Sequence, residues 1–189
     1  MTLEQFHTHA PSEHSIGGIF ADGELHMVHK KYADDGKTLI SAAVLGVMLV
    51  VDPNLKSSAF TPLWSYVDHG AKETKWGDKS YDSSSRYSAE WEVTGADVPI
   101  DVYKSFLPDD KTFFHYIGSL TTYPYTNGIN WFLFETPIFI TTADLENIKM
   151  AVKKQKHTLT STEFYHSNAD NRPIQPQVGS YISYIRDSN

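Results

Sequence analysis

The sequence predicts a mainly β fold with one large, central, twisted and mostly antiparallel sheet and a few peripheral helices. Three observations favour this fold. Several short segments alternate polar and apolar residues with a period of two, as strands with one buried face do. Residues 40–51 are almost wholly apolar, which is typical of a central strand covered on both faces. Only two segments show the apolar spacing of an amphipathic helix.

The predicted strands are bounded by turn residues, and the later ones are rich in β-branched and aromatic side chains. The link between the first two strands contains Gly17-Gly18 and Asp22-Gly23, which are turn signals, so these strands are predicted to pair antiparallel. Asp52-Pro53-Asn54 ends the apolar strand. In chain order the predicted strands span residues 3–9, 24–29, 40–51, 112–119 and 129–140.

Two helices are predicted on the periphery. Residues 60–67 place apolar side chains at i, i+3, i+4 and i+7. The second helix follows a Thr-x-x-Asp signature at Thr141, a pattern typical of helix N-termini, and its apolar positions fall within residues 145–152. The polar, Ser- and Tyr-rich residues 75–105 are predicted to be loop with a short strand or two. Residues 168–177, which contain two prolines, are predicted to be irregular.

Composition limits the classes of function. With 189 residues, 40% hydrophobic and 13% aromatic, and no internal repeat or linker, residues 1–189 are predicted to form a single, monomeric domain. A net charge of −7 without a basic run argues against binding of nucleic acid. No segment approaches the roughly 20 apolar residues of a membrane helix, and no signal peptide is recognised, so no membrane partner and no particular compartment are predicted. Because the chain has no cysteine, a metal would be held by histidines and carboxylates.

Five of the nine histidines lie within the first 29 residues. His7 and His9 share one face of a strand, and His26 lies on the neighbouring predicted strand. Because paired strands are about 5 Å apart, the three imidazoles can converge on one point. Three neutral imidazoles suit Zn²⁺ and leave a fourth position for water, as in catalytic sites. Spacing alone leaves the alternative open that these are surface histidines or hydrogen-bonded core histidines.

The same stretch resembles a known family. QFHTHAPSEH followed by ELHMVH is similar to the signatures of the α-class carbonic anhydrases. The resemblance continues in order through AAVLGVMLVV, YIGSLTTYP, INWFLFETPIFIT and NRPIQP, from residue 5 to about 177. It implies an α-carbonic-anhydrase-like fold. It also implies a zinc-dependent carbonate dehydratase, a lyase that reversibly hydrates CO₂ to bicarbonate and a proton by means of hydroxide on zinc.

The resemblance also implies which residues form the zinc site. His7, His9 and His26 match the three zinc ligands of the family. Gln5 and Glu24 match the partners that hydrogen-bond the ligand imidazoles and so fix their tautomers and orientation. The alternation of both residues with the histidines along the two strands fits that role.

Further positions match the catalytic machinery of the family. Thr121 matches the threonine that orients the attacking hydroxide, and Glu13 matches the carboxylate that receives the proton of that threonine. His14 and Tyr116 match members of a buried hydrogen-bond network behind Glu24, for which a structural role is expected. The remaining matches are the apolar CO₂ pocket, Val28, Val44, Leu120 and Trp131, and the anion-site residue Thr122.

The chain departs from the family at its start. Family members begin well before the strand that carries Gln5, so the sequence predicts an N-terminally truncated domain in which no proton shuttle is assigned. Two other hypotheses stay open beside the enzyme. One is a non-catalytic or impaired relative that serves as a binding or storage protein, and the other is a truncated fragment. The complete set of three ligand histidines favours the enzyme.

Overall fold

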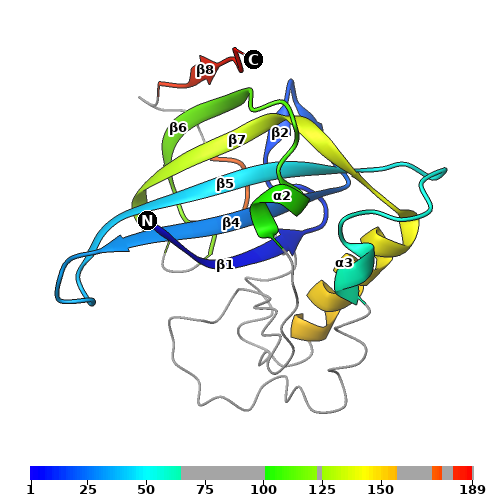
Figure 1. The fold of residues 1–189 in the computed structure, drawn as a ribbon, viewed down its shortest axis with the longest axis horizontal. Coiled ribbons are helices and arrows are strands. Elements are labelled where there is room, and N and C mark those ends of the chain that lie inside the picture. The colour runs from blue at the N-terminus through cyan, green and yellow to red at the C-terminus, as the bar shows by residue number, and fades with distance from the viewer. Residues whose placement is uncertain (65–100, 123–124, 157–171, 176–180, 189) are drawn as a thin grey trace.

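A six-stranded mixed sheet forms the centre of the molecule (Figure 1). The computed structural model describes residues 1–64, 101–122, 125–156, 172–175 and 181–188. The order of the strands in this sheet is β1-β4-β5-β7-β6-β8. Their bounds are β1 Thr2–His9, β4 Gly23–Tyr32, β5 Leu39–Val51, β6 Phe113–Ser119, β7 Asn127–Ile140 and β8 Ser183–Ile185.

The pairing of the strands confirms the prediction of a mostly antiparallel sheet. Only β5 and β7 run parallel among the described pairs of this sheet. The apolar strand β5 lies between β4 and β7, as predicted for a central strand. Successive residues along it are buried, so both of its faces are covered. A separate two-stranded ribbon, β2 Ser15–Ile16 and β3 Ile19–Phe20, lies in the link between β1 and β4.

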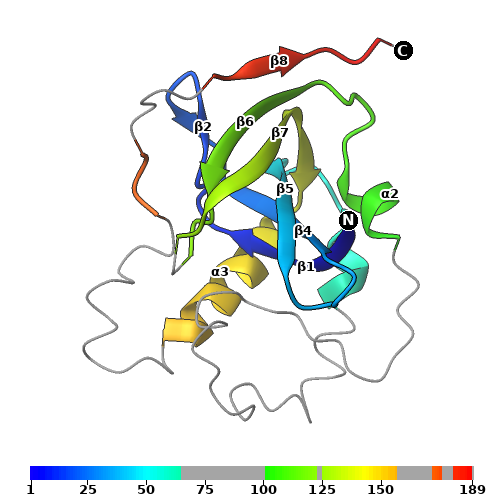
Figure 2. The ribbon, with the colours of Figure 1, turned by 90° about the vertical axis from the view of Figure 1, so that its left-hand side faces the viewer.

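Strand alternation divides the buried residues of the sheet between its two faces. Leu25 and Met27 of β4 point to the face that packs against the helical segments. Three segments cover this face: residues 61–64, the short helix α2 Val102–Phe106, and α3 Thr142–Lys156 (Figures 1 and 2). Glu24, His26 and Val28 point to the opposite face, where Val28 joins a second, smaller apolar cluster. The predicted site therefore lies on the face away from the main core.

Helix α3 begins with the reciprocal cap that the Thr-x-x-Asp signature predicts. The Asp144 amide donates to Thr141 Oγ1 at 3.0 Å, and the Thr141 amide donates to Asp144 Oδ2 at 2.9 Å. Asp144 also accepts from Trp64 Nε1 at 2.7 Å and from Ser58 Oγ at 2.8 Å. One buried carboxylate thus joins α3 to the segment that contains residues 58–64.

Replacement of Asp144 by alanine is expected to lower the free energy of unfolding by about 3 kcal/mol, because several buried donors lose their acceptor. Chemical denaturation measures this change. Glu146→Ala on the same helix is the matched control. The Glu146 side chain is exposed and pairs only with Lys149 among the described residues, so a change below about 0.5 kcal/mol is expected. Equal effects of the two substitutions would contradict the role assigned to Asp144.

Several predictions about local structure need correction or fall outside the described residues. Helix α2 lies where loop was predicted, because a five-residue helix is too short to show a period. Its cap, in which Asp101 accepts from the Lys104 amide, is the only local signal. Strand β8 was not predicted, since its three residues are all exposed. The first predicted helix is described only at residues 61–64, and most of the predicted loop and irregular segments lie outside the described residues. None of the described helices has the length and hydropathy that crossing a membrane requires.

Candidate metal centre

Three histidine side chains from two adjacent strands meet on one face of the sheet. His7 and His9 come from β1, and His26 of β4 lies directly opposite His7 in the register. Their ring centroids are 5.0 Å (His7–His9), 5.2 Å (His7–His26) and 4.7 Å (His9–His26) apart. One ring nitrogen from each lies within 4.8 Å of the others, and all three residues are buried. The convergence predicted from the sequence is therefore present.

Hydrogen bonds fix the tautomers of two of these rings. The Nδ1 of His7 lies 2.6 Å from Gln5 Oε1, which can only accept, so the proton is on Nδ1 and the lone pair on Nε2. His26 Nε2 donates to Glu24 Oε1 at 2.8 Å, so its lone pair is on Nδ1. Gln5 and Glu24 thus occupy the positions that the sequence predicts for them, each aiming one imidazole lone pair at the shared space.

Four buried polar atoms around this space have no hydrogen-bond partner in the part of the chain that the structure describes. Among the described residues they are His7 Nε2, both ring nitrogens of His9, and Glu13 Oε2. Buried polar atoms without a partner are unusual in folded proteins and cost free energy. A cation bound by nitrogen lone pairs would satisfy the imidazoles, and three imidazoles are a donor set that suits Zn²⁺. The residues present therefore fit a zinc ion.

Burial and neighbouring charges keep two of the imidazoles neutral. Burial, followed by the nearby imidazole of His26, lowers the pKa of His7 to about 3. Burial, His26 and His7 likewise hold the pKa of His9 well below its usual value. For His26, burial lowers the pKa, but the carboxylate of Glu24 outweighs it and the net shift is upward. At neutral pH, His7 and His9 therefore have the lone pairs that a metal needs.

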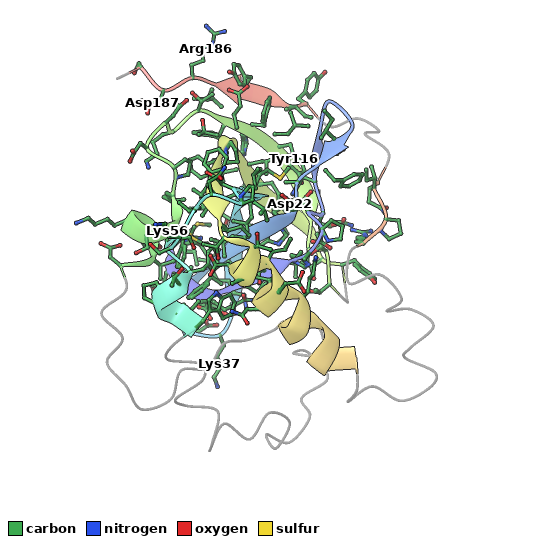
Figure 3. All side chains as sticks on the ribbon, turned by 90° about the vertical axis from the view of Figure 1, so that its right-hand side faces the viewer. Asp22, Lys37, Lys56, Tyr116, Arg186 and Asp187 are labelled. Carbon is green, nitrogen blue, oxygen red and sulfur yellow. The ribbon has the colours of Figure 1, made fainter. Side chains whose placement is uncertain are left out.

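Glu24 is the centre of a buried hydrogen-bond network. Its Oε2 accepts from the backbone amides of Glu13 and His14 at 2.9 and 2.8 Å. Its Oε1 lies 2.5 Å from His14 Nδ1, and His14 Nε2 in turn contacts the hydroxyl of Tyr116, which Figure 3 labels. Burial raises the pKa of Glu24, but His14 and His26 outweigh it and hold this pKa well below its usual value. The anionic carboxylate thus anchors His26 from behind.

Glu13 presents one carboxylate oxygen to the histidines. Its Oε1 accepts from the backbone amide of Arg172 at 2.9 Å. Its Oε2 lies 3.4 Å from His9 Nε2 and 3.9 Å from His26 Nδ1. Thr121, the predicted partner of Glu13, does not hydrogen-bond to this carboxylate, although both residues line one cavity of about 890 Å³. Thr121 and Glu13 therefore line the same cavity, but no hydrogen bond joins them.

The predicted CO₂ pocket is a compact apolar cluster beside the histidines. Trp131 stands edge-on to His26, with 4.8 Å between the ring centroids. Thr122 lies in a turn in which its carbonyl accepts from the Tyr125 amide at 2.8 Å, and no described contact joins it to the three histidines. The predicted pocket residues that the structure places in one cluster are Val28, Val44, Trp131 and, at its margin, Leu120.

The sequence matches the profile of the eukaryotic-type carbonic anhydrases over residues 1–185. The chain belongs to this family. Among curated carbonic anhydrases it is 31% identical over 180 residues to that of Pectobacterium atrosepticum and 27% identical over 180 residues to that of Klebsiella pneumoniae. These alignments cover 95% of the chain but 57% and 56% of the two relatives. The chain therefore spans a little over half the length of these carbonic anhydrases.

Solved carbonic anhydrases share the fold. A halotolerant carbonic anhydrase from Dunaliella salina matches with a TM-score of 0.63 and 27% identity, over 95% of this chain and 59% of that one. The α-carbonic anhydrase from Thermovibrio ammonificans, solved with the inhibitor sulfanilamide, matches with a TM-score of 0.59 and 25% identity, over 95% and 61%. The fold class predicted from the sequence is confirmed by these carbonic anhydrase structures.

One residue that contacts Glu13 was not predicted to have a role. Arg172 donates its backbone amide to Glu13 and its guanidinium to Ser119 Oγ and the Leu120 carbonyl. Because it lies 159 positions from Glu13, local pattern could not place the two together. The only signal was the NRPIQP match, which marked the segment without indicating what Arg172 contacts.

Proposed function

We propose that this chain is a zinc-dependent carbonate dehydratase that interconverts CO₂ and bicarbonate. The observation that carries the proposal is a set of buried imidazole nitrogens on His7 and His9 that have no hydrogen-bond partner among the described residues. They face His26 and Oε2 of Glu13. Unpaired buried nitrogens lower the stability of a purely structural core, whereas around a metal they serve as ligands. Membership of the carbonic anhydrase family supports this assignment of the chemistry.

The residues of the site have distinct roles in binding the metal. His7, His9 and His26 would hold zinc, which when bound lowers the pKa of water and supplies a nucleophile at neutral pH, the chemistry of which carbonic anhydrases are the type case. Gln5 and Glu24 keep two of the ligand rings in the binding tautomer.

The surrounding side chains bind and orient the substrate. The apolar wall of Val28, Val44 and Trp131 suits CO₂, which has no net charge, and excludes water from the reacting carbon. The free Oε2 of Glu13 is placed to accept a proton from a hydroxyl group that approaches the histidines. We propose that Thr121 supplies this hydroxyl when substrate is present, since both residues line the same cavity.

Stopped-flow hydration of CO₂ by the purified, zinc-loaded chain tests the proposal. We expect hydration above the rate in buffer, loss of activity after chelation and recovery on adding zinc. Sulfanilamide, the inhibitor in the Thermovibrio ammonificans structure, is expected to inhibit. If the chain bound one zinc but did not hydrate CO₂, the proposed enzymatic activity would be refuted and a non-catalytic zinc-binding relative would be favoured. Sedimentation in the same samples tests the further proposal that the chain is a monomer.

A further inference from the structure

Arg172 contacts both parts of the site that carry the predicted catalytic pair. Its backbone amide donates to Glu13 Oε1 at 2.9 Å. Its guanidinium Nη1 donates to Ser119 Oγ and, at 3.3 Å, to the carbonyl of Leu120, the residue before Thr121. A single residue therefore joins the turn that holds Glu13 to the end of β6.

The guanidinium is itself held in place. Its central carbon lies 4.5 Å from the centroid of the Tyr125 ring, a cation–π distance. Tyr125 has a φ of 58°, the left-handed region that non-glycine residues adopt rarely, and its amide donates to the Thr122 carbonyl. The guanidinium of Arg172 is thus both packed against the Tyr125 ring and hydrogen-bonded to Ser119 and Leu120.

The contact with Glu13 decides which oxygen of the carboxylate faces the histidines. Because Oε1 accepts from the Arg172 amide, Oε2 is directed at His9 Nε2 and His26 Nδ1. Without that donor the carboxylate could rotate and bring either oxygen, or neither, to the metal-binding space. The hydrogen bonds from the guanidinium to Ser119 and Leu120 keep the backbone beside Thr121 at a constant position relative to Glu13.

We propose that Arg172 is a positioning residue whose guanidinium fixes its own backbone amide against Glu13 and thereby sets the orientation of the Glu13 carboxylate toward the three histidines. The importance of this orientation for turnover rests on the proposed function. The orientation itself does not, and it can be measured in the metal-free protein.

Hydrogen exchange of the residue 172 amide, followed by NMR, tests the orientation directly. In the unaltered chain this amide is expected to be protected by Glu13. In Arg172→Ala it is expected to exchange at least about tenfold faster, the equivalent of one hydrogen bond, while the amides of β4 and β5 keep their rates. Arg172→Lys, which retains a donor, is expected to lie between. Arg186→Ala is the matched control, since Arg186 lies over Tyr184 at the outer edge of the molecule (Figure 3).

An unchanged rate at residue 172 in Arg172→Ala would overturn the inference. Faster exchange in β4 and β5 to the same extent would overturn it too, because that result indicates general loss of stability rather than loss of one contact.

Kinetics of the zinc-loaded variants test the consequence for turnover. Per bound zinc, kcat/KM for CO₂ hydration is expected to fall about tenfold in Arg172→Ala, with zinc affinity unchanged and partial rescue in Arg172→Lys. If Arg172→Ala had a normal kcat/KM although its residue 172 amide exchanged faster, the proposed consequence for turnover would be refuted. If the unaltered chain shows no hydration, the proposed function fails, whereas the exchange measurement still decides whether Arg172 orients Glu13.

Discussion

Replacement of His9 by leucine is expected to weaken zinc binding by roughly a thousandfold and to leave the metal-free protein at least as stable as before. His9 is buried, and neither of its ring nitrogens has a hydrogen-bond partner among the described residues. A leucine of similar size removes two unpaired polar atoms, so the free energy of unfolding of the metal-free protein is expected to rise by up to about 2 kcal/mol. Competition with a chromophoric chelator gives the zinc affinity, and urea denaturation gives the stability.

The opposite changes in affinity and stability distinguish a metal ligand from a core histidine. His115→Leu is the matched control, because His115 lies on β6 and hydrogen-bonds Asn130 rather than facing the three histidines. We expect this control to retain zinc affinity. If His9→Leu lost several kcal/mol of stability and bound zinc normally, His9 would be a structural residue and the proposed ligand set would be wrong.

Replacement of Glu13 by glutamine is expected to lower kcat/KM for CO₂ hydration by about a hundredfold or more while zinc stays bound. The substitution keeps the shape of the side chain and an acceptor for the Arg172 amide, but it removes the negative charge beside His9 and His26. When the amide oxygen of glutamine accepts from the Arg172 amide, the NH₂ group takes the place of Oε2. Because NH₂ can only donate, it cannot accept from a hydroxyl group, and the group that reacts with CO₂ is no longer oriented. Stopped-flow kinetics and elemental analysis of the same sample separate turnover from metal content.

Glu135→Gln provides the control for Glu13→Gln. Glu135 is an exposed residue of β7 that accepts from the Tyr184 hydroxyl at 2.6 Å, so its substitution makes the same chemical change away from the site. Its activity is expected to match that of the unaltered chain. Full activity in Glu13→Gln would show that the carboxylate takes no part in the reaction.

Much of the sheet and the arrangement of the histidines could be predicted from the sequence because both depend on short-range rules. Alternation placed His7 and His9 on one face, and the turn glycines predicted the antiparallel pairing that sets His26 opposite His7. The Thr-x-x-Asp signature predicted the reciprocal cap at Thr141 for the same reason, since all its atoms lie within one helical turn.

The features that could not be predicted depend on contacts between distant segments. The parallel pairing of β5 with β7 joins strands separated by about 80 residues, and nothing local distinguishes it from an antiparallel pairing. The hydrogen bond from the Arg172 amide to Glu13 joins residues that are 159 positions apart. The missing hydrogen bond between Thr121 and Glu13 likewise depends on the tertiary structure, because each side chain is placed by a different turn.

X-ray absorption spectroscopy at the zinc edge of the loaded chain tests most directly whether His7, His9 and His26 bind a single ion. We expect one zinc per chain with three imidazole nitrogens at about 2.0–2.1 Å and one further light atom, and one imidazole fewer in His9→Leu. A shell dominated by carboxylate or water oxygens, or one unaltered by His9→Leu, would contradict it.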